Sequence, residues 1–427
     1  MTPGAGLADR PQGTPFQPPT QVPPSTSLVI VSHGRPAALA LCLKAVALMD
    51  HPEAEVIVVA DTPSLPATAG MAIKTVAFDT ANISMARNLG LAQAAGEVVA
   101  FLDDDAIPEP DWLFRISLPF LDPRVDAAAG AARGRDGMSW QFRAGWVDPT
   151  GTTTRFAPAP ETRLFPPGPN GQAISALGAT CAFRRRALAA IGGFRSHHRY
   201  HLDETDVCLR LAQAGGWSAV VPEAEVIHGA AASARRTAER VTTDLTEIGA
   251  SAAAFWRSHA ASADLGALAA ALCADQRRRL IAQMLAGTVE PGQVEPILST
   301  LDAGLREGAI RPLDPGAPIP APPPFLRFPL GPRPARVLVG RRWNQAALRA
   351  RASALAREGA VVTLLLLSRT TLPHRQRFCA AGYWEQAGGL WGASHPGLPR
   401  PWHSRFRTRA RREAEALPPR RRTPPEG

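Results

Sequence analysis

A short apolar run that ends in three consecutive aspartates constrains this chain more than any other feature. Residues 98–102 are apolar throughout, and Asp103, Asp104 and Asp105 follow directly. A continuous apolar run of this length is typical of a buried strand in a parallel sheet. Three carboxylates at its tip would repel one another in a crevice of low dielectric, and a divalent cation would relieve that repulsion. The pattern indicates a metal-nucleotide site beyond the carboxyl end of a strand. A solvated acidic turn before Pro108 is the alternative.

Strand-like and helix-like stretches alternate over residues 28–228. The strand-like runs are 28–31, 55–60, 73–78, 97–102, 173–183, 220–221 and 226–228, and the helix-like stretches are 36–49, 84–95, 184–191 and 203–214. This order predicts an α/β fold with a mostly parallel sheet that is flanked by helices. Residues 133–170 are rich in Gly, Pro, Thr and Trp, which favours loops and short strands.

Composition divides the chain into five segments. These are a disordered Pro-rich N-terminus (1–26), the α/β core (27–230), a helical extension (231–310), a Pro-rich linker (311–335) and a small C-terminal α/β unit with a basic tail (336–427). The extension carries an apolar face at Leu265, Leu268, Leu272, Leu280, Ile281, Met284 and Leu285. Because proline-rich linkers mark domain boundaries, we expect a cut near Pro312 to break few contacts with the core.

The net charge of +10 is carried almost entirely by arginine, since the chain has only two lysines. This skew does not indicate nucleic-acid binding. The basic stretch from Arg405 to Arg422 is either a solvated tail or a contact with anionic lipid headgroups. No apolar stretch approaches the roughly 20 residues that span a membrane, and the N-terminus lacks the pattern of a secretory signal. Five scattered cysteines without metal-ligand spacing favour a reduced, cytoplasmic protein.

Polar residues follow several of the predicted strands. Ser32 and Arg35 follow the first, Asp61 follows the second, and Arg87 lies in the early turns of the helix after the third. Because the tips of adjacent parallel strands lie about 5 Å apart, these side chains are expected near the triple aspartate. Asp61 would accept a hydrogen bond from a base or a ribose, and the arginines would neutralise phosphate. Taken alone, Arg87 is more typical of a surface helix residue.

In combination, these motifs resemble glycosyltransferase family 2, which has the GT-A fold. The matching stretches are Val29–Ser32, Arg35, Val58–Asp61, Ala86–Gly90, Gly96–Asp105, Pro108, Trp112–Leu113, Gly178–Phe194, Leu202–Arg210 and Val226–His228. The resemblance covers about residues 27–260. It implies a nucleoside-diphosphate sugar donor and Mn²⁺ or Mg²⁺, with Asp105 as a metal ligand. It also implies that the donor lies against Ser32, Arg35, Asp61, Arg87, Asn88, Asp103 and Asp104. The sequence Asp61-Thr-Pro departs from the family pattern, in which a second acidic residue is commoner.

The resemblance also implies a catalytic base in the acidic segment at 203–206. Glu204 is the first candidate and Asp203 the second, and Asp203 as a simple helix cap is the alternative. Asp206 is expected to brace the helix start and to pair with Arg210 four residues later. His228 is either a metal or phosphate ligand or a structural histidine. Arg235–Arg236 form either a phosphate contact or an exposed basic face. Trp112 and Trp140 either stack on sugar rings or belong to the core, and the core is favoured for Trp112.

The resemblance thus implies an inverting, metal-dependent glycosyltransferase acting in surface polysaccharide or glycan synthesis. Its acceptor would be a glycan or a lipid-linked glycan, and it would be cytoplasmic, with peripheral contact to the inner face of an anionic membrane. The alternative is a nucleotide-sugar or glycan-binding protein with a decayed site, against which the intact aspartates argue. A nucleotidyltransferase is disfavoured, because Ser32-His-Gly-Arg35 is not a Gly-rich, lysine-bearing loop.

Overall fold

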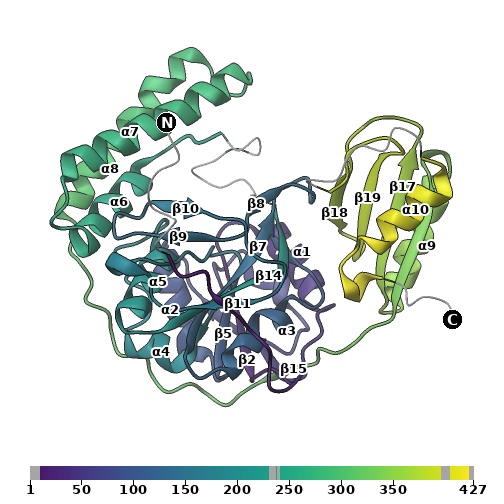
Figure 1. Cartoon of the computed structure of the whole chain (residues 1–427), viewed down its shortest axis with the longest axis horizontal. Coiled ribbons are helices and arrows are strands. Elements are labelled where there is room, and N and C mark those ends of the chain that lie inside the picture. Colours follow the sequence, from purple (N-terminus) through teal and green to yellow (C-terminus); the bar gives the residue numbers. More distant parts are fainter. Residues whose placement is uncertain (1–9, 230–236, 238–240, 396–403, 423–427) are drawn as a thin grey trace.

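The computed structural model describes residues 10–229, 237, 241–395 and 404–422. A central sheet flanked by helices carries a three-helix extension on one side and a small α/β unit on the other (Figure 1). No helix in the described part of the chain combines the length and the apolar character needed to cross a bilayer.

The central sheet is built on the apolar runs. Its main strands, in spatial order, are β4 (Lys74–Ala77), β3 (Ala54–Ala60), β2 (Thr26–Ser32), β5 (Val98–Asp103), β13 (Cys181–Arg184), β7 (Val125–Arg133) and β14 (Trp217–His228). All of them run in one direction except β13, which pairs antiparallel with both β5 and β7. The predicted α/β fold with a mostly parallel sheet is therefore confirmed.

Short strands extend this sheet or lie beside it. They are β1 (Thr14–Pro15), β6 (Ala106–Pro108), β8 (Trp140–Phe142), β11 (Arg163–Phe165) and β15 (Arg327–Phe328) in the main sheet, and β9 (Gly145–Val147), β10 (Thr153–Arg155) and β12 (Ala173–Ile174) in a separate sheet. The stretch 173–183, expected as one strand, is thus split between two sheets. Conversely, β14 joins two predicted strands into one, with an irregularity in its pairing between Val220 and Glu225.

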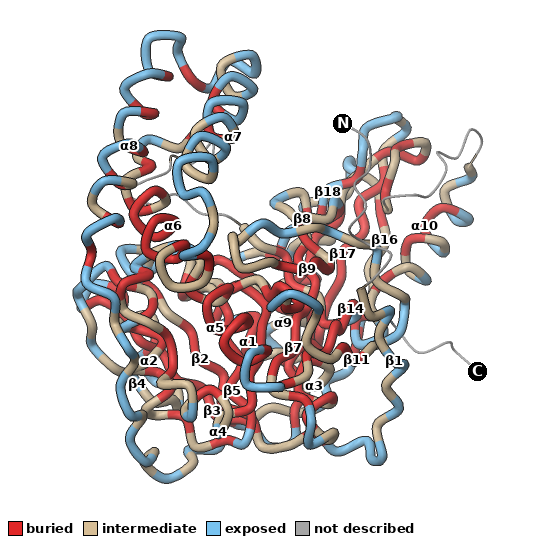
Figure 2. Tube along the Cα trace, turned by 60° about the vertical axis from the view of Figure 1, so that its left-hand side comes forward, coloured by how far each residue is buried: buried red, intermediate tan, exposed pale blue. Residues whose placement is uncertain are grey.

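Helices cover both faces of the sheet, which leaves its central strands buried (Figure 2). They are α1 (Pro36–Val46), α2 (Ile83–Gln93), α3 (Trp112–Ser117), α4 (Arg185–Ala190) and α5 (Asp203–Gln213). Pro36 begins α1, where a missing N–H costs nothing, and the Asn82 side chain accepts a hydrogen bond from the Met85 N–H at the start of α2. Gly90 lets α2 approach β2 closely, because a Cβ there would lie 2.4 Å from Val29 Cγ1.

The helical extension consists of α6 (Thr246–His259), α7 (Leu265–Leu285) and α8 (Val294–Ile310). The backbones of α6 and α8 approach closely at Gly304, where a Cβ would lie 2.0 Å from the Thr246 carbonyl oxygen. The apolar face expected on α7 is only partly used. Leu280 is buried, but Ile281 and Leu285 are exposed, because only one side of α7 faces the rest of the extension.

The proline-rich segments follow the surface of the α/β core. Residues 1–26 were expected to be disordered, yet Thr14–Pro15 pairs with β11, and residues 1–9 lie outside the described part. In the linker, Arg311 is buried and Asp314 accepts hydrogen bonds from the N–H and hydroxyl of Ser196. Further on, β15 adds to the edge of the sheet by pairing with β3.

The C-terminal unit is a second, smaller α/β layer. Its elements are β16 (Ala335–Arg341), α9 (Gln345–Arg357), β17 (Val361–Ser368), β18 (Arg375–Cys379), β19 (Tyr383–Gly389) and α10 (Phe406–Glu415), with strand order β16-β17-β19-β18. Short 3₁₀ helices in this unit are Arg342–Asn344 and Pro419–Arg421, and those in the rest of the described chain are Leu65–Thr68, Leu118–Leu121, Pro169–Gly171 and Pro291–Gln293. The basic stretch is therefore not a solvated tail, because it folds as α10 and buries Arg409 against Glu413.

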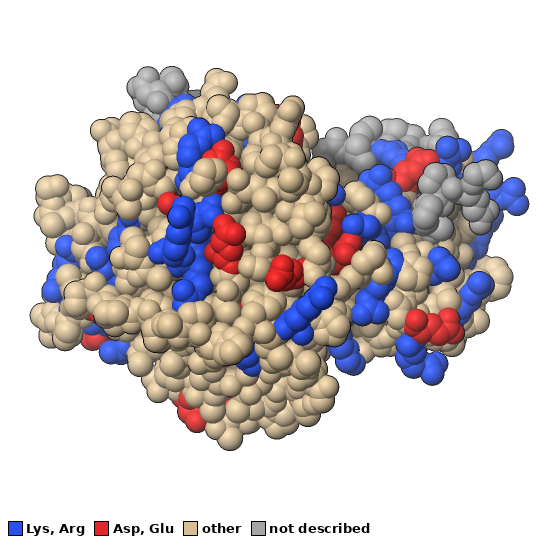
Figure 3. All heavy atoms as spheres, turned by 90° about the horizontal axis from the view of Figure 1, so that it is seen from below, with Lys and Arg blue, Asp and Glu red and all other residues tan. Residues whose placement is uncertain are grey.

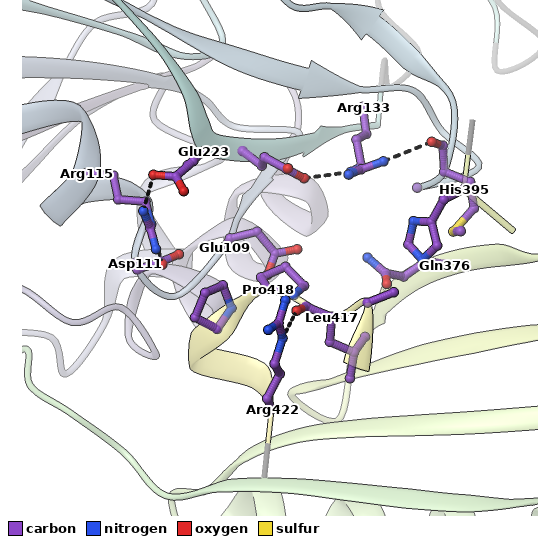
Figure 4. A pocket seen from close by; sticks show the side chains of 15 residues that line it. Glu109, Asp111, Arg115, Arg133, Glu223, Gln376, His395, Leu417, Pro418 and Arg422 are labelled. Atoms are coloured by element: carbon purple, nitrogen blue, oxygen red, sulfur yellow. Dashed lines mark hydrogen bonds and ion pairs between the residues drawn. The ribbon is translucent and has the colours of Figure 1, made fainter. Parts of the chain in front are cut away.

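The C-terminal unit packs against the α/β core along a mixed apolar and charged interface. Phe378 and Trp384 share an apolar cluster with Ile107 and Ile227 of the core. Arg421, fully buried, pairs with Glu109 of the core at 2.8 Å. A pocket of about 230 Å³ lies beside this pair, and side chains of both units point into it (Figure 4). The expectation that a cut near Pro312 would break few contacts is therefore wrong.

Candidate active site

The three aspartates at the tip of β5 point in different directions. Asp104 is fully buried, and it accepts a hydrogen bond from the Ser32 hydroxyl at 2.7 Å. Arg35 lies 2.7 Å from the other Asp104 oxygen and 3.3 Å from Asp105. Burial raises the pKa of Asp104 to about 7, while Arg35 and Ser32 act in the opposite direction. Asp104 and Ser32, both expected on the donor, thus support the loop from within the fold.

Asp103, Asp105 and His228 form a compact group at the same edge of the sheet. Their potential ligand atoms all lie within 4.8 Å of one another. His228 reaches this group because the end of β14 pairs with β6, which follows Asp105 directly. Carboxylate oxygens with one imidazole nitrogen suit Mn²⁺ or Mg²⁺, so the residues fit the cation that the sequence implied. The ring of His228 is held from behind by Gln141, at 3.1 Å from Nδ1.

Asp61 lies at the tip of β3, close to the turn after β2. Its Oδ2 accepts a hydrogen bond of 2.9 Å from the N–H of Gly34, whose φ of 68° requires a residue without a side chain. Its Oδ1 is buried and has no hydrogen-bond partner among the described residues. Because buried carboxylate oxygens are normally paired, this atom offers a place for a ligand hydroxyl or N–H.

Arg87 is the centre of the site. Its guanidinium is 3% exposed and pairs directly with Asp203. It also lies 3.4 Å from Asp103 and 3.8 Å from Glu204. Although burial opposes the charge, these carboxylates raise the pKa of Arg87, which keeps the guanidinium charged. The buried guanidinium of Arg87 therefore joins Asp103, at the end of β5, to the acidic start of α5.

Asp203 and Glu204 begin α5 immediately after a residue in a left-handed conformation, Leu202 with φ of 67°. Left-handed backbone is uncommon for a leucine and is found mostly where surrounding structure imposes it, often at functional sites. Asp203 is 2% exposed, whereas the Glu204 side chain is 18% exposed. Burial and the neighbouring Asp203 raise the pKa of Glu204 well above its usual range, against the lowering effect of Arg87.

Asp206 holds the start of α5 in place, as predicted. Arg210 contacts it at 2.8 Å and 2.5 Å through two nitrogens, which confirms the predicted pairing four residues apart. His259, at the end of α6, contacts the other Asp206 oxygen at 2.8 Å. These partners hold the pKa of Asp206 far below its usual range, against burial, so the carboxylate stays charged. The helical extension therefore helps to fix the acidic segment.

Other residues singled out in the sequence have partners within the protein or lie outside the described residues. Both ends of the Asn88 side chain bind the backbone of Phe194, at 2.6 Å and 2.8 Å, so Asn88 braces this turn. Trp112 is fully buried, as favoured, and donates to the Thr180 hydroxyl. Trp140 lies against Arg133. Arg235–Arg236 lie outside the described residues.

Sequence reasoning missed Gln141 and His259, which support His228 and Asp206. In each of the pairs Gln141–His228 and Asp206–His259, the two residues are more than 50 positions apart in the sequence. Neither belongs to a recognisable motif, so no local signal marks them.

One protein family has a model that matches part of this chain. The model of the family described as glycosyl transferase family 2 matches residues 27–192. This match includes the tips of β2, β3 and β5 and the start of α2, but it ends before Asp203 and His228. No curated protein matches.

Three solved structures are similar to this chain at low sequence identity. They are GalNAc-T7 with UDP, GalNAc and Mn²⁺ (16% identity, 48% of this chain and 44% of that one, TM-score 0.41), the Pyrobaculum calidifontis mannosyltransferase PcManGT with GDP-Man and Mn²⁺ (18%, 69% and 89%, 0.41), and S. aureus TarS (15%, 65% and 43%, 0.38). This chain thus spans less than half the length of the GalNAc-T7 and TarS chains. Residues 27–192 therefore match the model of glycosyl transferase family 2, the family that the sequence motifs resemble.

Proposed function

We propose that this protein is an inverting glycosyltransferase that moves a sugar from a nucleoside-diphosphate sugar to an acceptor hydroxyl, in surface polysaccharide or glycan synthesis. The observation that carries the proposal is the position of Arg87. It touches Asp103, which belongs to the group that fits a cation, and Asp203 and Glu204, which are candidate bases. Donor-side and acceptor-side carboxylates thus flank a single site.

On the donor side, Asp61 is proposed to bind the base or the ribose through its buried Oδ1. Asp103, Asp105 and His228 would hold Mn²⁺ or Mg²⁺ against the diphosphate. A divalent cation there supplies Lewis-acid stabilisation of the charge that develops on the leaving nucleotide. Arg35 keeps Asp104 and Asp105 oriented, and its guanidinium, whose side chain is 25% exposed, remains accessible to phosphate.

On the acceptor side, Glu204 is proposed as the general base. A base must accept a proton from the acceptor hydroxyl as that oxygen attacks the sugar carbon. The raised pKa of Glu204 makes it a stronger proton acceptor than an ordinary glutamate. Asp203 is the weaker candidate, because it is almost fully buried and directly paired with Arg87. Attack from the side opposite the leaving nucleotide would invert the configuration of the sugar.

The acceptor is proposed to be a glycan or a lipid-linked glycan that is met at an anionic membrane surface. Residues 331–427 hold 19 arginines against five acidic residues. Figure 3 shows basic side chains spread over the visible face of the C-terminal unit, all of them arginines, with few acidic groups between them. Each such charge near an anionic surface contributes about 1 kcal/mol. Five free cysteines fit the cytoplasmic location included in this proposal.

A screen of nucleotide sugars for thermal stabilisation in the presence of Mn²⁺ tests the proposed function. A donor at a hundred times its Kd should add about 2.7 kcal/mol of stability. The stabilising compound should then be consumed when an acceptor is supplied. Stabilisation by a nucleotide sugar that is never hydrolysed or transferred would favour the alternative, a binding protein with a decayed site.

A further inference from the structure

A cavity of about 1020 Å³ lies between the α/β core and the helical extension. Glu204 lies in its wall, together with Leu177 from the core and Gln276 from α7. The cavity therefore extends from Glu204, the proposed base, toward α7. This helix begins more than 70 residues after the end of the segment that matches family 2.

The size of the cavity exceeds what one sugar requires. Cavities of about 300–1,000 Å³ hold ligands of drug size. A hexose is much smaller than such a ligand, so a single ring would leave most of this space to water. The volume fits an acceptor with several sugar units.

The lining suits a ligand that is rich in hydroxyls. Side-chain amides and hydroxyls, each able to donate and accept hydrogen bonds, come from Gln141, Thr153, Ser175, Thr205, Gln276 and Gln283. Tyr200 offers an aromatic ring, and Leu202 and Leu280 offer apolar surface for the C–H faces of sugars. The lining carries two arginines, Arg155 and Arg279, against two carboxylates, Glu204 and Asp244. Because acidic and basic side chains are mixed in the lining, neither sign of charge predominates strongly enough to select a charged ligand.

Helix α7 forms the outer wall of this cavity. Of its residues, only Gln276 and Leu280 are buried, and both line the cavity. Together with Arg279 and Gln283 they follow the spacing of one helical face. The wall is held in position by the rest of the extension. The Trp256 indole donates to the Thr150 carbonyl oxygen at 3.0 Å, and His259 binds Asp206.

We infer that this cavity is the acceptor subsite and that the α7 wall selects an uncharged oligosaccharide of at least two sugar units. The inference rests on the proposed function, because it uses Glu204 as the base. It assigns to the helical extension the choice of acceptor. The donor nucleotide would bind without touching α7, since Asp61, Asp103 and Asp105 do not line the cavity.

An array of printed neutral glycans with one to six sugar units tests this inference with the full chain. Ala282 lines the cavity and is exposed, so Ala282→Trp fills the space without burying a new group in the core. Ala274→Trp is the matched control, because Ala274 is an exposed residue of α7 that does not line the cavity. We expect the wild-type chain to retain at least one glycan of two or more units, Ala282→Trp to weaken that binding at least tenfold, and Ala274→Trp to leave it within twofold.

Calorimetry with UDP and GDP in the presence of Mn²⁺ accompanies the array. Nucleotide affinity should be the same in the wild type and in both variants. Retention of monosaccharides alone, no retention of any glycan, or wild-type glycan binding by Ala282→Trp would overturn the inference. Loss of nucleotide binding in Ala282→Trp would also overturn it, because the cavity would then belong to the donor. Glycan binding by a chain that consumes no nucleotide sugar would instead contradict the proposed function alone.

Discussion

At the scale of single residues, Arg87 decides how the site is held together. Its neighbours Asp103, Asp203 and Glu204 come from two elements that are about a hundred residues apart in the sequence. Removing one partner of a buried ion pair leaves an uncompensated charge, which costs more than the pair itself contributes. Arg87 is therefore expected to be both a structural and a functional residue.

The variant Arg87→Met should lower the free energy of unfolding by about 3–5 kcal/mol, because Asp203 would remain buried without its partner. Chemical denaturation measures this change. The control is Arg124→Met, which removes an exposed arginine paired with Asp122 and should leave stability almost unchanged. Equal stability of Arg87→Met and the wild type would contradict the role of Arg87 as the partner that stabilises the buried Asp203.

The pH dependence of transfer should report Glu204. A general base works only when it is deprotonated, and burial with Asp203 raises the pKa of Glu204. Transfer should therefore increase as pH rises, with a midpoint above that of an ordinary glutamate near 4.3. A kcat profile measures this midpoint. A profile that is already flat at pH 5 would contradict the assignment of the base.

At the scale of elements, the sequence predicted the parts of the sheet that are buried on both faces. The runs that became β2, β3 and β5 are continuous and apolar, so their pattern is unambiguous. It did not predict that residues 217–228 form one strand, because Pro222 interrupts the apolar pattern. Nor did it predict that the Asp104 side chain is buried. Three adjacent aspartates cannot be distinguished by sequence, and the direction of each side chain is set by the turn between β5 and β6.

The packing of α2 on β2 depends on Gly90. Alanine normally stabilises a helix relative to glycine by about 1 kcal/mol. At Gly90, however, the added Cβ would lie 2.4 Å from Val29 Cγ1. Gly90→Ala should therefore destabilise the protein by about 1–3 kcal/mol, as overpacking does. Gly266→Ala in α7 is the control and should be neutral or stabilising, because the nearest atom is 3.2 Å away on the flexible side chain of Asp264. Thermal or chemical unfolding distinguishes the two.

At the scale of the whole molecule, the C-terminal unit and the α/β core share buried contacts. Arg421 donates to Glu109 of the core and to Thr363 and Gln376 of its own unit. The sequence identified the linker by its prolines, but it carried no sign of this pair, whose members are 312 residues apart. Prediction of the site from sequence is limited in the same way. Local motifs identified Asp103, Asp105 and Glu204. The supporting residues Gln141 and His259 could not be identified, because their contacts form only in the tertiary fold.

Arg421→Met should lower stability by about 3–5 kcal/mol, because it leaves Glu109 buried and unpaired. The neighbouring Arg422→Met, at an exposed position, is the matched control and should have little effect. Adding Glu109→Gln to Arg421→Met should recover part of the loss, since the uncompensated charge is then removed. A double variant that is as unstable as the sum of the single variants would contradict this account.

The central claim is that Asp105 holds the donor through a cation while Glu204 acts only on the acceptor, and one paired measurement tests it. For Asp105→Ala and Glu204→Gln, calorimetry measures the nucleotide affinity with and without Mn²⁺. The transfer rates of the same two variants are measured alongside. We expect Asp105→Ala to lose Mn²⁺-dependent binding and transfer together. Glu204→Gln should bind like the wild type and transfer at least ~100-fold more slowly. Unchanged Mn²⁺-dependent affinity in Asp105→Ala, or full activity in Glu204→Gln, would contradict the claim.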